Sequence, residues 1–301
     1  MHATGHMRLR KAKDIFADVS IRFSLYLVNA IVFIIAAVLF FRARPILATH
    51  SILSLIFSSS WHPLRGEFGF YPFIVGTLEV TGISMILAVP VCLLSAIYLS
   101  EYAHKSFRDF MRVAIDIMAG IPSVIYGLCG VIAVVPCIGG LGGVLGSSTT
   151  GYSLLAGGII LAIMVSPVIM SVTTEVLRTI PQEARESSLA LGVTKWEMVK
   201  HVILRSSLHG IIAAIVLGFA RAFGETIAVL MVIGNVPKVP TSLFDPAYPL
   251  PALIANNYGE MMSIPQYDSA LMFAALLLLL VVGGFSLLAN LTLLRLEKKG
   301  G

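Results

Sequence analysis

The sequence predicts an all-α polytopic membrane protein with six transmembrane helices. Of its 301 residues, 57% are hydrophobic and only 12% are charged, whereas a typical soluble domain is about 25% charged. The apolar residues form long stretches, each able to build the helix of about 20 residues that crosses a bilayer. The polar segment 179–205 separates the fourth and fifth stretches, so we expect it to lie outside the membrane.

Each of the six stretches is long enough to span the hydrocarbon core as a helix. The first could be mistaken for a signal peptide, but no small-residue cleavage site follows it and it is long enough to remain as an anchor. We expect residues 1–22 to be a basic N-terminal segment, 23–294 a six-helix domain and 295–301 a tail. The predicted spans are Phe23–Phe41, Ile74–Ser100, Val113–Val135, Tyr152–Glu175, His209–Gly234 and Asp268–Leu294.

The basic residues predict the orientation of the chain, because Lys and Arg gather in cytoplasmic loops. Sixteen of the 21 Lys and Arg residues lie in the N-terminal segment, the loop near Lys105, the segment 179–205 with the adjoining Arg178, and the C-terminal tail. Only four lie on the opposite side, and Arg221 lies within a span. We therefore expect a plasma membrane protein whose two termini and polar segment are cytoplasmic.

The three outer connections differ in character. Residues 42–71 are predicted to be irregular with a short interfacial helix. The Gly- and Ser-rich residues 136–151 indicate a flexible loop. Residues 236–267 are rich in proline and apolar enough to lie along the membrane interface.

The segment 179–205, which we call the elbow, is predicted to form two short helices joined at a sharp corner. Gly192 suits the left-handed residue that ends the first helix. Each helix begins with residues that fit a capping box. A cytoplasmic elbow of this kind indicates a docking surface for a partner. The boxes are Thr179 with Gln182, and Thr194 with Glu197.

The fifth span carries two charges, Arg221 and Glu225, which a continuous helix would place one turn apart on one face. Charged residues within a span cost about 2.5–3.5 kcal/mol each on insertion scales, so they are retained for a reason. One interpretation is a structural ion pair that locks helix packing. The other is a path for an anion, with Arg221 attracting it and Glu225 preventing a permanent trap.

The sequence offers no catalytic constellation and no metal-ligand spacing. Its three cysteines lie in or beside apolar spans, which favours buried thiols over a zinc site or disulfide framework. No Gly-rich phosphate-binding loop followed by Lys and Ser or Thr is present, so ATP and Mg²⁺, if used, must be bound by another chain. The net charge of +5 is spread around apolar segments and does not indicate nucleic-acid binding.

The sequence of the elbow resembles a motif of a known protein family. Glu186-Ser-Ser-Leu-Ala-Leu-Gly192, followed by Val202-Ile-Leu204, resembles the Glu-Ala-Ala loop of ABC importer permeases. Here serines replace the two alanines, Val202 replaces Ile, and Arg205 stands where Pro is usual. The resemblance implies the type I ABC importer permease fold and ATPase docking through Glu186, Ser187, Ser188 and Gly192.

The resemblance narrows to the phosphate-specific importers over residues 58–293. It implies a half-pore that pairs with a homologous second permease, two copies of a cytoplasmic ATPase and an extracytoplasmic phosphate-binding protein. The candidate residues of a substrate path are Arg221 and Glu225, with Thr226 beside them and Ser123 next to Pro122. Six segments carry this resemblance, and the last two of them favour the first of the two permease subunits. They are Phe68-Gly-Phe-Tyr-Pro72, Ala96-Ile-Tyr-Leu-Ser-Glu-Tyr-Ala103, Ala119-Gly-Ile-Pro-Ser-Val-Ile-Tyr-Gly127, Ala220-Arg-Ala-Phe-Gly-Glu-Thr-Ile-Ala-Val229, Met231-Val-Ile-Gly-Asn235 and Ser242-Leu-Phe-Asp-Pro246.

Three alternatives stay open on the residues alone. The chain could serve a related oxyanion importer for sulfate, molybdate or phosphonate, since a binding protein would select the anion. A passive anion channel would need no ATPase and would leave the elbow unexplained. A membrane-embedded enzyme would need a nucleophile, base or metal site within its spans, and none is evident.

Overall fold

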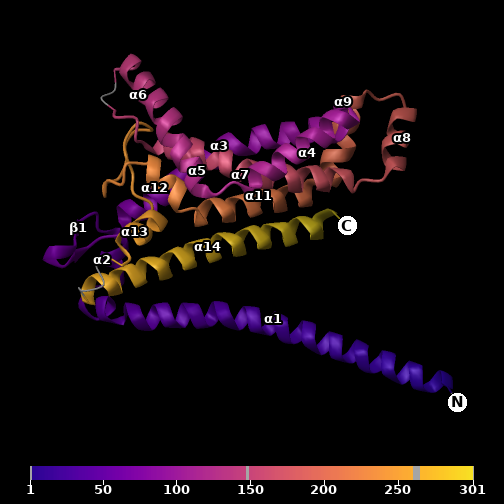
Figure 1. Cartoon of the computed structure of the whole chain (residues 1–301). Coiled ribbons are helices and arrows are strands. Elements are labelled where there is room, and N and C mark those ends of the chain that lie inside the picture. Colours follow the sequence, from indigo (N-terminus) through magenta and orange to yellow (C-terminus); the bar gives the residue numbers. More distant parts are fainter. Residues whose placement is uncertain (1, 147–148, 260–264, 301) are drawn as a thin grey trace.

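The computed structural model describes residues 2–146, 149–259 and 265–300, and in this part of the chain helices predominate (Figure 1). Five continuous helices are long and apolar enough to cross a membrane, and the sixth candidate span is the pair Lys195–Ser206 and Leu208–Gly224, which meet at 70°. The all-α, six-span prediction is therefore confirmed.

Membrane-length helices make up most of the molecule. They are α1 (His2–Thr49), α3 (Tyr71–Ile97) with its π-helical extension η2 (Tyr98–Tyr102), the run α5 (Ser123–Cys129), η3 (Gly130–Val134) and α6 (Val135–Val144), α7 (Leu154–Arg178) and α14 (Pro265–Gly300).

Shorter elements connect these helices or complete the bent span. They are α2 (Ile52–Phe57), β1 (Trp61–His62), η1 (Pro63–Arg65), β2 (Glu67–Phe68), α4 (Lys105–Gly120), α8 (Gln182–Ala190), α9 (Lys195–Met198), η4 (Val199–Ile203), α10 (Leu204–Ser206), α11 (Leu208–Gly224), α12 (Ile227–Val232) and α13 (Leu250–Asn257).

The third span differs from the prediction Val113–Val135. An amphipathic helix, α4, ends at Gly120, and a membrane-length helix then runs from Ser123 to Val144. The break falls at Ile121 because the residue before a proline is pushed out of the α region. The flexible loop expected over residues 136–151 is accordingly wrong in its first half, which is helical as far as Val144.

The core of the bundle is the contact between α3 and α7, and glycines make it close. A Cβ added at Gly158 would lie 2.5 Å from a side-chain carbon of Ile83, and one at Gly157 would lie 3.1 Å from Val80. Small residues at such contacts let two membrane helices approach until their backbones nearly touch. The same device recurs at Gly218 of α11, whose added Cβ would meet Ile169 of α7 at 2.5 Å.

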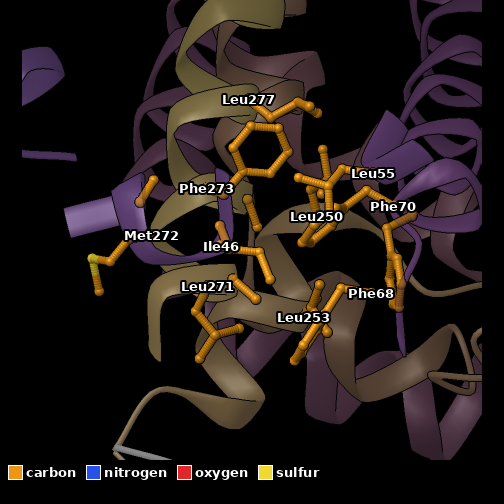
Figure 2. Close-up of a cluster of buried hydrophobic side chains, with 14 of the residues drawn as sticks. Ile46, Leu55, Phe68, Phe70, Leu250, Leu253, Leu271, Met272, Phe273 and Leu277 are labelled. Atoms are coloured by element: carbon orange, nitrogen blue, oxygen red, sulfur yellow. The ribbon is translucent and has the colours of Figure 1, made fainter. Parts of the chain in front are cut away.

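A second cluster of buried side chains ties the outer connections to the ends of α1 and α14 (Figure 2). Arg42 of α1 also pairs with Asp268 of α14 at 3.4 Å. The expected short helix between the first two spans is present as α2, and it is followed by a two-stranded hairpin that the sequence did not reveal. The labelled members of the cluster are Ile46, Leu55, Phe68, Phe70, Leu250, Leu253, Leu271, Met272, Phe273 and Leu277.

The molecule has two distinct ends (Figure 1). The hairpin strand β1, α2, α6 and α13 lie at one end. The elbow helices α8 and α9 lie at the other end, where the N-terminal end of α1 and the C-terminal end of α14 also point. Six spans with both chain ends at the end that carries the elbow agree with the predicted topology.

Candidate functional site

The elbow folds as two short helices that project from the end of the bundle (Figure 1). Gly192 joins them with φ of +82°, the left-handed conformation expected at this position. Thr194 and Glu197 form the predicted capping box, with Glu197 Oε2 accepting from the Thr194 N–H at 2.8 Å and Thr194 Oγ1 accepting from the Glu197 N–H at 3.2 Å. These local signals therefore fix the corner of the elbow.

The first predicted capping box is wrong. Pro181, and not Thr179, immediately precedes α8, and no side chain caps that helix. The Thr179 hydroxyl instead donates to the carbonyl of Val176 at 2.7 Å, because α7 extends as far as Arg178 and leaves this threonine at its end. Gln182 donates to Glu186 Oε1 at 3.2 Å along α8.

The predicted docking residues lie on the outside of the elbow. Glu186, Ser187 and Gly192 are exposed, whereas the Ser188 hydroxyl donates to the Ala184 carbonyl at 2.7 Å within α8. Large apolar side chains are exposed beside them. Exposed apolar side chains gathered on a polar projection are typical of a surface that a protein partner covers. They are Leu189, Leu191, Val193 and Trp196.

A buried ion pair that sequence reasoning missed attaches the elbow to the bundle. Arg185 of α8 donates from Nη2 to Glu101 Oε1 of η2 at 3.0 Å, and the Glu101 side chain is only 6% exposed. The two residues are 84 positions apart, so no local pattern in a single sequence could reveal the pair. Lys195 of α9 adds a second link, with its ammonium 4.8 Å from the centre of the Tyr102 ring.

The fifth span is broken where the sequence predicted a continuous helix. Helix α11 ends at Gly224, Glu225 adopts an extended conformation, and α12 begins at Ile227. Glu225 Oε1 accepts from the Ala228 N–H at 3.3 Å, so this carboxylate caps the next helix. Arg221 and Glu225 therefore do not share a helical face, and the part of the chain that the structure describes contains no ion pair between them.

Arg221 lies near the end of α11 with its side chain exposed. Within residues 2–146, 149–259 and 265–300, no hydrogen bond or ion pair of its guanidinium is found. The Tyr126 hydroxyl donates to the Met118 carbonyl of α4 at 2.7 Å, which bridges the break before Ser123. An exposed, uncompensated guanidinium can bind an anion with two parallel hydrogen bonds.

The two helix breaks are neighbours, because α5 packs directly on α12. A Cβ added at Gly127 of α5 would lie 3.2 Å from the Cα of Ala228. Ser123 is the first residue of α5 and is half-buried, and Thr226 precedes α12 with its hydroxyl donating to the Gly224 carbonyl at 3.3 Å. The predicted path residues thus lie on adjoining broken helices, which is where membrane transporters hold their substrates.

The comparisons with known proteins agree with this architecture. Residues 88–298 match the family described as the binding-protein-dependent transport system inner membrane component. The chain belongs to this family. It is therefore a multi-pass inner membrane component of a transport system. No group of three or more His, Cys, Asp or Glu residues that could hold a metal ion occurs among the residues searched.

Curated members of the family match almost the whole chain. The phosphate transport system permease protein PstC of Xylella fastidiosa is 36% identical over 313 aligned positions, covering 97% of this chain and 95% of the relative. PstC of Mesorhizobium japonicum is 34% identical over 82% of this chain and 80% of the relative. The probable PstC of Methanocaldococcus jannaschii is 30% identical over 86% and 87%.

Solved structures confirm the type I ABC importer permease fold. The inward-facing methionine transporter MetNI matches with a TM-score of 0.54 at 19% identity, over 77% of this chain and 95% of that chain. A bacterial alginate importer matches with a TM-score of 0.51 at 17% identity, over 84% and 89%. At these identities the likeness concerns the fold alone.

Proposed function

We propose that this chain is the channel-forming permease subunit of an ATP-driven importer of inorganic phosphate. The observation that carries the proposal is the match to phosphate permeases along nearly the full length of both chains. The exposed elbow and the unpaired Arg221 add support, because the first suits a motor that acts from outside the membrane and the second suits an oxyanion.

The proposed complex contains a homologous second permease subunit, two copies of a cytoplasmic ATPase and an extracytoplasmic phosphate-binding protein. ATP and Mg²⁺ bind to the ATPase subunits, so this chain carries no cofactor and catalyses no reaction itself. The ATPases dock on the elbow through Glu186, Ser187, Ser188 and the turn at Gly192. Both termini and the elbow then lie in the cytoplasm of a bacterial or archaeal cell, as the distribution of Lys and Arg favours.

Arg221 is the residue proposed to attract phosphate within the path. Its planar guanidinium presents paired N–H donors that match two oxygens of a tetrahedral anion. Ser123 and Thr226 supply hydroxyls near the same two helix breaks and can hydrogen-bond an ion whose hydration shell has been removed. Glu225, four residues from Arg221, places a negative charge nearby that limits how long the anion stays.

Proteoliposomes test this function directly. The chain is reconstituted with the second permease, with and without the ATPase, and the binding protein is added on the side opposite the elbow. We expect phosphate uptake only when the ATPase and ATP are both present. Uptake without the ATPase would identify a passive channel, and sulfate or molybdate uptake in place of phosphate would identify a different oxyanion importer.

A further inference from the structure

Helix α8 carries the proposed docking residues, yet it has no buried residue of its own. The second half of the elbow is anchored differently. Met198, Val199 and Ile203 are buried in a cluster with the ends of α3, α7 and α11. Any force applied to α8 must therefore pass either through its chain ends or through polar contacts with the bundle.

Arg185 supplies those polar contacts. Besides its bond to Glu101 Oε1, its Nε donates to Glu101 Oε2 at 3.4 Å. Its Nη2 also donates to the Leu177 carbonyl at 2.8 Å, and its Nη1 donates to the Ile180 carbonyl. The Leu177 carbonyl belongs to the last turn of α7, where backbone acceptors lack partners within the helix, and Ile180 lies two residues beyond the end of α7. One side chain on α8 thus binds the ends of both α3 and α7.

Glu101 also has contacts within its own segment. It lies in η2, a π-helical turn closed by the Ala103 N–H donating to the Tyr98 carbonyl at 2.8 Å. The extra residue of a π turn rotates the following side chains relative to an uninterrupted α-helix, and such turns are frequent at functional sites. Ser100 Oγ also donates to Glu101 Oε1 at 2.9 Å. These contacts orient the carboxylate toward Arg185 of the elbow.

Because the pair is largely buried, it resists separation and can transmit movement between α8 and the bundle. The side chains of Arg185 and Glu101 are 17% and 6% exposed, so water cannot readily replace either partner. Separating two buried charges leaves each without compensation, which is strongly unfavourable. Arg185 and Glu186 are consecutive, and consecutive side chains on a helix point about 100° apart. One faces the bundle and the other faces outward.

We infer that the Glu101–Arg185 pair is a positioning element that makes α8 and the inner ends of α3 and α7 move as one body. The inference rests on the proposed function, because it assigns the route by which motion of an ATPase at Glu186 reaches the transmembrane helices. Since α3 packs along α7 and both helices pack against α11, displacement of their ends alters the contacts of α11, which carries Arg221.

The test measures phosphate uptake and ATP hydrolysis in the same proteoliposomes containing the complete complex. The central variant is the double Glu101→Gln, Arg185→Gln, because it removes both charges and leaves no unpaired buried ion. We expect it to assemble and hydrolyse ATP, while uptake per ATP falls about tenfold, within the range by which changes along a coupling network alter communication between sites.

Two further variants separate positioning from folding. Arg185→Lys keeps the charge but lacks the planar set of donors that binds Glu101 and two carbonyls together, so we expect partial recovery of uptake per ATP. Asp109→Asn and Arg112→Gln remove exposed charges from α4, near the same end of the molecule, and should leave the ratio unchanged.

The outcomes are distinguishable from a failure of the proposed function. Absence of ATP-driven phosphate uptake by the unmodified complex would overturn both the proposed function and the positioning role of the pair. Normal uptake by the unmodified complex, together with an unchanged ratio in the assembled double Gln variant, would overturn the positioning role alone. An equal loss in the two α4 controls would also overturn the positioning role, because the effect would then follow from removing any charge near this end of the molecule and not from this pair.

Discussion

At the scale of single residues, Arg221 carries the chemical hypothesis. The sequence left open whether it forms a structural ion pair with Glu225 or serves an anion path. The break at Glu225 weakens the first interpretation, since the carboxylate caps α12 and leaves the guanidinium unpaired within the described chain. A charge with no structural partner is free to bind a mobile anion.

This difference gives a prediction for Arg221→Gln. If no ion pair is lost, the variant should assemble at the normal yield, while phosphate uptake per assembled complex should fall about tenfold to a hundredfold, the usual worth of a hydrogen bond to a charged group. Arg221→Lys should recover only part of the uptake. The measurement is phosphate uptake divided by the amount of assembled complex.

The double variant Arg221→Gln, Glu225→Gln supplies the control. It should assemble and still fail to transport. Uptake at the unmodified level by this assembled variant would contradict the path hypothesis and leave a structural role. Poor assembly by Arg221→Gln that the double variant corrects would point the same way.

Gly192 gives a second prediction at this scale. Its φ of +82° lies where side chains are disfavoured, yet an added Cβ would meet nothing within 4 Å. The cost of a substitution is therefore a backbone cost, about 1–2 kcal/mol for an ordinary residue and more for a β-branched one. Gly192→Val should reduce the amount of ATPase that copurifies with the chain.

Gly192→Asn is the matched comparison, because asparagine tolerates the left-handed region far better than valine. It should retain the ATPase and transport at close to the normal level. Equal losses in the Val and Asn variants would show that the glycine is needed for contact with the partner and not for its backbone conformation.

At the scale of elements, local patterns located the helices but not their interruptions. The apolar stretches predicted all six spans, and the second, fourth and sixth were placed to within a few residues, apart from the longer C-terminal end of α14. The break at Ile121 is signalled by Pro122, but the predicted span Val113–Val135 ran through it. No proline marks the break at Glu225, so the apolar pattern predicted a continuous helix there. The Glu101–Arg185 pair depends on tertiary packing and left no local trace.

The contact between α3 and α7 predicts the effect of Gly158→Ala. The new methyl would lie 2.5 Å from a carbon of Ile83, whose β-branched side chain cannot move aside easily. We expect a loss of about 1–3 kcal/mol, the usual cost of overpacking, seen as a lower midpoint in thermal unfolding of the detergent-solubilised complex.

Gly283→Ala in α14 is the control for the change of residue type, since nothing lies within 4 Å of its added Cβ. Alanine favours a helix over glycine by up to about 1 kcal/mol, so this variant should be as stable as the unmodified protein or slightly more stable. A similar unfolding midpoint for both variants would refute the claim that Gly158 sets the distance between α3 and α7.

At the scale of the whole molecule, one end carries the elbow and the helix ends, and the other carries the hairpin and α13 (Figure 1). This polarity follows from an even number of spans, and the distribution of Lys and Arg gives it a direction. The most apolar stretch of the membrane-length part of α1 has no buried side chain. The first span is therefore unpacked along most of its length. Lipid or another subunit must cover that helix.

Two equally exposed leucines give the final prediction, a test of orientation. Leu191 at the elbow corner is 84% exposed and Leu64 in the hairpin is 88% exposed, so cysteines placed there should react at similar rates with a reagent that reaches them. In a background with Cys92, Cys129 and Cys137 replaced by alanine, a membrane-impermeant maleimide should label Leu64→Cys in intact cells. Leu191→Cys should be labelled only after the membrane is opened, and less when the ATPase is present, because the docked partner covers it. The reverse pattern would place the elbow outside the cell, where no ATPase could reach it, and would refute the proposed coupling.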